Sequence, residues 1–325
     1  MNSSPEHNGI TELIRELKVR QVRELAWCCF GPDVVAALTY PASGYRVPLD
    51  DRTIDWLRSL DGDPGALLAH LSGRRSTRLG LYFESLWQFY WQAFSGDTLI
   101  SHNRQINGDS RTLGAFDFIL ASNDGHYRHI EAAVKFYLGQ GEDLRQLAAW
   151  VGPNANDRLD IKVRHLTDHQ LPLLHRREAM EQLRLDGMDS AHVEQHFLLR
   201  GWLFAPARAD LTELPPGVNR EALQGRWWYL RDFTAGTASG AFTADKPFFS
   251  VIPRNHWLAP VRYHRALQPL QRTELNFALI SQVGGLGVPK MVARLEPEKD
   301  IWQECERFFV VPDHWPATAK PSRNT

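Results

Sequence analysis

Two acidic side chains and one lysine stand in residues 113–138, LGAFDFILASNDGHYRHIEAAVKFYL, at spacings that suit metal-assisted chemistry. The alternation of apolar and polar residues predicts two strands, with Asp117 in the first and Glu131 and Lys135 on one face of the second. Residues 123–125, Asn-Asp-Gly, are typical of a hairpin turn. We therefore expect antiparallel strands, with Asp117 beside the row that runs from Glu131 to Lys135.

The chemistry that these side chains predict is phosphodiester hydrolysis. A divalent cation such as Mg²⁺ or Mn²⁺ prefers oxygen ligands, and a neighbouring lysine can position or polarise the water that the ion activates. A plainer interpretation stays open, in which Glu131 and Lys135 are the solvent face of a half-buried hairpin.

The helix that would position a further acid precedes the hairpin. Residues 78–94, RLGLYFESLWQFYWQAF, repeat apolar side chains with a helical period, and Glu84 stands at the rim of the apolar stripe. From this rim Glu84 can reach the edge of a site on the sheet, although an ordinary glutamate at the boundary of the core has the same pattern.

This order of elements resembles the PD-(D/E)XK nuclease-like superfamily over about residues 76–206. The resemblance implies an α/β (α+β) fold with a restriction-endonuclease-like αβββαβ core around a mixed central sheet. It also implies Mg²⁺-dependent cleavage of nucleic acid, with Asp117 and an acid on the third strand as metal ligands and Lys135 as the catalytic lysine.

Four phrases also resemble an uncharacterised bacterial family, domain-of-unknown-function family 1853. They are RLGLYFESLWQFY, LGAFDFIL, IEAAVKFYLG and GPNANDRLDIKVRHLTDHQL. This second resemblance covers most of the chain and implies no known activity.

The superfamily's acid stands two residues before the lysine, and here that position holds Ala133. Glu131 is two residues further back, which puts it about 13 Å from Lys135 along an ideal strand. Three alternatives stay open. A bulge brings Glu131 into place, Glu84 replaces the missing acid as a metal ligand, or the site has lost its metal.

A row of basic side chains follows the hairpin. The segment from about residue 155 to 171 is expected to be helical, and Arg158, Lys162, His165 and His169 recur along it at spacings of four, three and four. Beside an active site this row could hold a phosphate backbone, whereas elsewhere it would be a solvated face. His165 and His169 also have a spacing that suits zinc, but no third ligand accompanies them.

The rest of the chain predicts three units: an N-terminal helical cap (1–75), the nuclease-like core (76–206) and a β-rich C-terminal unit (207–325). The whole chain has 37 Lys and Arg residues and 38 Asp and Glu residues. This balance excludes a protein that is positively charged overall, so any surface for nucleic acid must be local. Three cysteines without a framework spacing, and no secretory or membrane-spanning segment, favour a cytoplasmic protein without a membrane partner.

Two function classes follow from these patterns. The first is a metal-dependent nuclease acting on DNA or RNA through Asp117, Glu131, Lys135 and Glu84. The second is an inactive protein of the same fold that binds nucleic acid or another protein, which Ala133 and the neutral overall charge favour.

Overall fold

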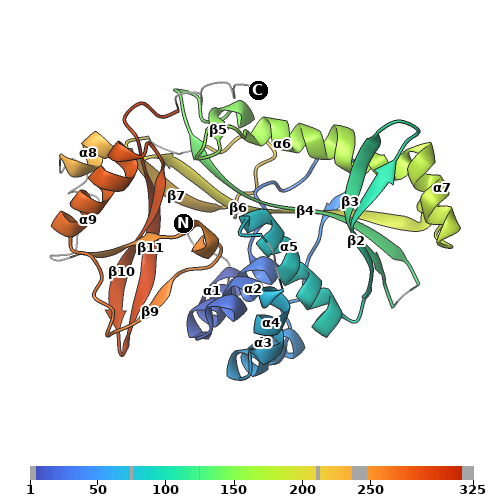
Figure 1. Ribbon diagram of the computed structural model, residues 1–325, viewed down its shortest axis with the longest axis horizontal. Helices are drawn as coiled ribbons and strands as arrows, with labels where there is room; N and C mark the ends of the chain where they lie inside the picture. Colours follow the sequence, from blue (N-terminus) through green and yellow to red (C-terminus); the bar gives the residue numbers. More distant parts are fainter. Residues whose placement is uncertain (1–4, 74–75, 124, 210–212, 236–246, 317–325) are drawn as a thin grey trace.

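A computed structural model describes residues 5–73, 76–123, 125–209, 213–235 and 247–316 of the chain. Within these residues, eleven strands form one mixed sheet (Figure 1). Its main path runs β2-β3-β4-β6-β7-β11-β10-β8, while the short strands β1, β5 and β9 pair with β6, β4 and β11. The bounds are β1 Ser43–Gly44, β2 Thr98–Asn107, β3 Thr112–Ala121, β4 Tyr127–Gly139, β5 Trp150–Val151, β6 Val193–Pro206, β7 Leu223–Tyr229, β8 Phe248–Ile252, β9 Arg262–His264, β10 Lys290–Glu298 and β11 Ile301–Val311.

The long strands β4 and β6 run in parallel across the middle of the molecule and join its two ends. The antiparallel strands β2 and β3 lie at one end, and β7, β11 and β10 lie at the other. β3 also pairs antiparallel with β4, as the hairpin pattern predicts. Pairing of β6 with β7 and of β7 with β11 is also parallel, so the predicted mixed sheet is confirmed. Gly201 of β6 allows the close approach to β4, because a Cβ there would lie 1.7 Å from the carbonyl oxygen of Lys135.

Helices cover both faces of the central strands. Even-numbered residues of β4, such as Ile130 and Phe136, pack in the same core as α2 and α5. Odd-numbered residues such as Tyr137 pack with α6 on the opposite face. The helices are α1 Pro5–Glu16, α2 Arg20–Phe30, α3 Asp51–Gly62, α4 Gly65–Ser72, α5 Leu79–Tyr90, α6 Leu159–His165, α7 Arg177–Leu185, α8 Leu230–Thr234 and α9 Arg272–Leu279.

The two helices expected beside the hairpin are present. α5 continues through a wider turn, η1 (Trp91–Ser95), so the helix predicted over 78–94 is confirmed. The second helix begins at Leu159 instead of residue 155, because the Gly152 N–H donates to the Asp157 carbonyl and Ala155 takes a left-handed φ of 59°. It continues through η3 (Leu166–Gln170) and η4 (Leu171–His175).

The expected helix–three strands–helix–strand order runs from α5 through β2, β3, β4 and α6 to β6, with the short β5, the helix α7 and several single turns inserted. The sheet continues beyond residue 206 into β7, and one buried core extends from Leu13 to Trp315. The three cysteines are free thiols. Among the described residues, no helix is both long and apolar enough to span a bilayer.

Candidate active site

The site lies where β3 and β4 separate. Their ladder ends at the pair Phe118 and Ile130, whereas β4 stays paired with β6 as far as Leu138. On its other edge, residues 131–137 of β4 have no strand partner among the described residues until β5 pairs with Leu138. A free edge of this kind exposes backbone groups to a ligand.

A cleft of about 660 Å³ follows this free edge. One wall is the start of α5 and another is the loop that precedes α6, while the C-terminal half of the chain contributes Arg254 and Trp257. The charged side chains that line the cleft are Arg78, Glu84, Lys135, Asp157, Lys162 and Arg254.

Asp117 and Glu131 do not themselves line this cleft but adjoin Ala132, which does. They occupy the first level past the end of the ladder, and Asp117 Oδ2 accepts a hydrogen bond from the Ala132 N–H at 2.9 Å. The Ala132 N–H, which has no partner on β3 because the ladder has ended, is thus hydrogen-bonded by the Asp117 side chain. Glu131 reaches Asp117 without a bulge, since β4 keeps an unbroken register with β6, and the bulge alternative is therefore wrong.

Glu131 is fully buried and held by two neighbours. His129 Nε2 donates to its Oε1 at 2.8 Å, and the amide of Gln170 donates to its Oε2. Gln195 Nε2 donates to His129 Nδ1 at 3.1 Å, which leaves the ring proton on Nε2 for Glu131. Burial lowers the pKa of His129 to about 4, so its imidazole is neutral and Glu131 gains no full positive charge from it.

The two carboxyl groups resist ionisation together. Burial, followed by the negative charge of Glu131, raises the pKa of Asp117 well above its usual range. Burial also raises the pKa of Glu131, and Lys162 partly offsets that rise. No arginine pairs with either carboxylate among the described residues, so no guanidinium offsets the cost of ionising both groups.

The lysine nearest this pair is Lys162 of α6. Its Nζ donates to Gln170 Oε1 at 2.8 Å. Burial lowers the pKa of Lys162, and the negative charges of Glu131 and Asp117 offset part of that lowering. Lys135, the lysine that the superfamily resemblance implies for catalysis, donates instead to Asp157 Oδ2. Both lysines line the cleft, but only Lys162 is held against the carboxylate pair through Gln170.

Glu84 lines the cleft from α5 and accepts a hydrogen bond from His102 Nε2 at 3.1 Å. Its charge also contributes to the raised pKa of Asp117. Within the described part of the chain, no three His, Cys, Asp or Glu side chains form a group that could hold a metal ion unaided. Asp117, Glu131 and Glu84 are therefore not a preformed set of three ligands.

The carboxyl pair, rather than the net charge, is what suits a divalent cation here. Asp117, Glu131, Glu84 and Asp157 are balanced in number by the four basic side chains that line the cleft, so the net charge is zero when all eight groups are ionised. Mg²⁺ commonly takes one or two carboxylates and completes its shell with water and substrate phosphate, so three protein ligands are not required.

The four residues of the predicted basic row do not lie in one site. Arg158 precedes α6 and pairs with Asp160 at 2.6 Å. His165 is hydrogen-bonded to Gln170 Oε1, and the centre of the His165 ring lies 5.5 Å from that of the His169 ring. Of these four residues only Lys162 lines the cleft.

Three residues that support the site were not identified from the sequence: Gln170, Asp157 and His129. Gln170 lies eight residues after Lys162, where α6 has passed into η3, so the spacing of three or four that joins side chains on a regular helix gave no signal for their contact. The role of His129 depends on Gln195 of β6, so nothing local in the sequence indicates it.

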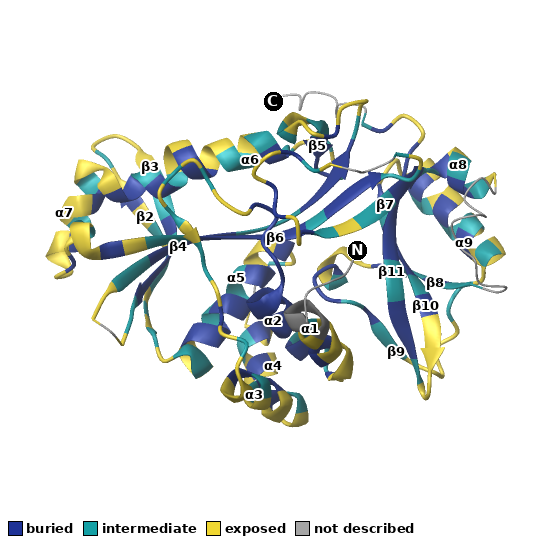
Figure 2. Cartoon of the chain, turned by 180° about the vertical axis from the view of Figure 1, so that it is seen from behind, coloured by how far each residue is buried: buried dark blue, intermediate teal, exposed yellow. Residues whose placement is uncertain are grey.

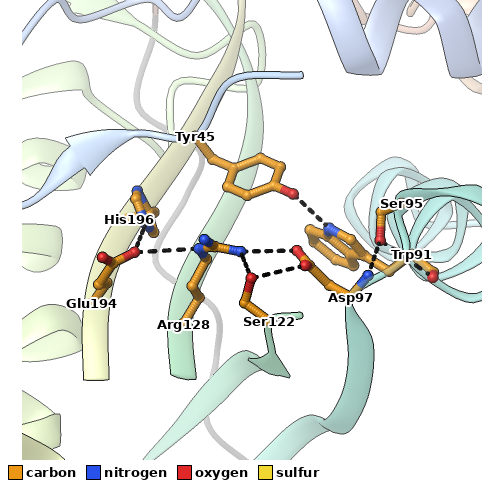
Figure 3. Close-up of polar contacts among 8 residues, drawn as sticks. All are labelled: Tyr45, Trp91, Ser95, Asp97, Ser122, Arg128, Glu194 and His196. Carbon is orange, nitrogen blue, oxygen red and sulfur yellow. Dashed lines mark hydrogen bonds and ion pairs between the residues drawn. The ribbon is translucent and has the colours of Figure 1, made fainter. Parts of the chain in front are cut away.

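In a second polar cluster, at the start of β4, the carboxylates have an arginine partner, unlike those of Asp117 and Glu131 (Figure 3). Arg128 contacts Asp97 and Glu194, each at 3.2 Å, and the Ser122 hydroxyl at 2.5 Å. Both carboxylates share one guanidinium there. This cluster ties the ends of β2, β3, β4 and β6 together and leaves no unpaired carboxyl pair comparable to that of Asp117 and Glu131.

Comparison with protein families gives one match: residues 23–311 match the model of the domain of unknown function DUF1853. No curated protein and no solved structure matches the chain.

Proposed function

This chain belongs to the DUF1853 family, and we propose that it is a metal-dependent nuclease of the PD-(D/E)XK type, acting on DNA or RNA in the cytoplasm. The observation that carries the proposal is the pair Asp117 and Glu131. Two carboxyl groups in contact, without an arginine partner among the described residues, destabilise a fold unless a cation or a proton neutralises them. Their place at the free edge of β4 supports a role in binding rather than in packing.

Each side chain has a part in the proposed reaction. Asp117 and Glu131 would hold Mg²⁺ or Mn²⁺ with Glu84 at the rim, and the ion when bound supplies Lewis acidity toward a phosphate oxygen. Lys162, oriented by Gln170, positions the attacking water beside the carboxylates. Lys135 and Asp157 shape the neighbouring wall of the cleft. The reaction adds one water across one P–O bond, so no redox partner is needed.

The superfamily assignment draws support from the order of elements between α5 and β6 and from Asp117 at the point where two strands separate. Ala133 in place of the expected acid departs from the pattern. In our proposal Glu131, two residues earlier, takes over that role because it lies level with Asp117.

The test is cleavage of single-stranded, duplex and branched DNA and RNA with Mg²⁺ and with Mn²⁺. We expect Asp117→Asn and Glu131→Gln to abolish cleavage. Glu194→Gln is the matched control, because Glu194 stands on the neighbouring strand with Arg128 as its partner. Loss of activity in the control as well, or a wild-type protein that cleaves none of these substrates, contradicts the proposal.

A second candidate is an inactive nuclease fold that binds nucleic acid or a protein. The absence of a three-ligand group among the described residues favours it. It predicts nucleic-acid or protein binding that is indifferent to divalent cations and to both substitutions.

A further inference from the structure

Building on the proposed nuclease function, we propose that the cleft takes a single nucleic-acid strand, and that Arg254 and Arg78 hold a phosphate of that strand at its mouth. Arg254 belongs to η7 (Arg254–His256) in the C-terminal half of the chain, and Arg78 is the N-cap of α5.

The position of Arg254 is set by a rigid aromatic ring. Its guanidinium lies 5.4 Å from the centre of the Trp257 ring, and the Trp257 indole donates to the Ile252 carbonyl at 3.1 Å. The same ring packs edge-on against Phe136 of β4, with ring centres 5.2 Å apart. The arginine is thereby held over the strand that carries Glu131 and Lys135.

Both guanidinium groups are available to an anion. Arg78 and Arg254 are exposed and line the cleft, and neither has a carboxylate within ion-pair distance among the described residues. Lys135, by contrast, is paired with Asp157 in the same cleft. Guanidinium groups bind phosphate through parallel hydrogen bonds, so two arginines that line one cleft without a carboxylate partner favour a phosphodiester ligand.

The shape of the cleft favours one strand over a duplex. Pockets of about 300–1,000 Å³ enclose ligands of drug size, and at about 660 Å³ this cleft falls in that range. It therefore suits one or two nucleotides. The carboxylate pair adjoins the cleft at Ala132, and α5, the loop before α6 and Trp257 wall it. A cleft that holds one or two nucleotides admits a strand with unpaired bases, whereas a paired helix is wider than that, and an arginine plane can stack on a base.

The experiment measures binding apart from cleavage. Fluorescence anisotropy would follow a 5′-labelled twelve-residue oligothymidylate, the matching oligouridylate and a blunt hairpin duplex, each with Ca²⁺ present. We expect the two single strands to bind more tightly than the duplex. Arg254→Ala should weaken single-strand binding about tenfold at low salt and reduce the slope of log K against log salt by about 0.7.

Arg265→Ala is the matched control. Arg265 is exposed and lies 4.4 Å over the Trp302 ring, as Arg254 lies over Trp257, but it does not line the cleft. Its removal should leave binding unchanged. A difference between the DNA and RNA strands would identify the natural substrate.

Each remaining outcome decides the proposal. Duplex binding as tight as single-strand binding overturns the single-strand assignment, and an Arg254→Ala protein that binds like wild type overturns the phosphate contact. If binding behaves as expected while the wild type cleaves nothing, the phosphate contact stands and the proposed nuclease activity alone is refuted.

Discussion

Lys162 and Glu131 are joined through one side chain: the amide nitrogen of Gln170 donates to Glu131 Oε2, and its oxygen accepts from Lys162 Nζ at 2.8 Å. Because an amide has one donor end and one acceptor end, this arrangement orients Gln170 and fixes a lysine and a carboxylate at a set separation. A helix and a strand that lie far apart in the sequence thus act as one site.

Replacing Gln170 by Leu should therefore damage both function and folding. The substitution leaves a buried carboxylate oxygen and a largely buried ammonium without this partner, at a cost of about 1–3 kcal/mol in the free energy of unfolding. Urea unfolding and cleavage assays measure the two effects. Gln146→Leu is the control, because Gln146 is exposed and, in the described part of the chain, its side chain bonds to Asp143 alone. Equal stability of the two variants would show that the bridge contributes nothing.

Asp117→Asn should stabilise the metal-free protein while abolishing activity. The pKa of Asp117 is raised in the folded state, so the folded protein retains a proton that the unfolded chain has lost. Stability therefore falls as the pH rises from the ordinary carboxyl range toward the raised pKa. The asparagine keeps an acceptor for Ala132 and removes the charge, and we expect about 1–3 kcal/mol of added stability at pH 8 and little at pH 4. Chemical unfolding in EDTA at both pH values tests the difference, and a destabilised variant at pH 8 would refute it.

Binding of Mn²⁺ should strengthen with pH through the neutral range. The pKa of Glu131 is raised to about 7 and that of Asp117 to about 8, so protons compete with the ion below these values. Affinity should rise from about pH 6 to about pH 8 and level off above. Calorimetry in two buffers of different ionisation enthalpy would report the released protons. Glu131→Gln should release fewer, and an affinity independent of pH would exclude this pair as ligands.

Lys162→Met should reduce cleavage far more than Lys135→Met. Lys162 lies with the carboxylate pair, whereas Lys135 is engaged by Asp157 in the wall of the cleft. We expect a loss of at least about a hundredfold for the first variant, of the size that positioned catalytic groups contribute, and a loss several times smaller for the second. Single-turnover rates at saturating enzyme separate this step from binding. The reverse order would restore Lys135 as the catalytic lysine.

Local sequence patterns predicted the strands and their pairing. Alternating residues between 113 and 138 gave two antiparallel strands, and the short turn set their register, so Asp117 was expected beside Glu131 and lies one level past the last ladder pair. The helical period over 78–94 likewise predicted α5. These features depend on neighbours within a few residues, which a single sequence displays directly.

Contacts between segments far apart in the chain could not be predicted from the sequence. The second helix starts at Leu159, because a loop closed between Gly152 and Asp157 overrides the helical pattern before it. The sheet also runs on past residue 206 into β7 and the largely buried β11, as Figure 2 shows. Parallel pairing of β6 with β7 leaves no turn signal, since the strands are joined by a long connection.

The residue types available for chemistry were determined by the sequence alone, and so was the absence of an acid at position 133. Tertiary structure decided which of them meet. It put Lys162 rather than Lys135 against Glu131, and it brought Arg254 over a strand more than a hundred residues earlier in the chain. The physical reason is that charge, burial and pKa depend on packing between elements, and this packing is set by the whole core rather than by the spacing of residues along one strand.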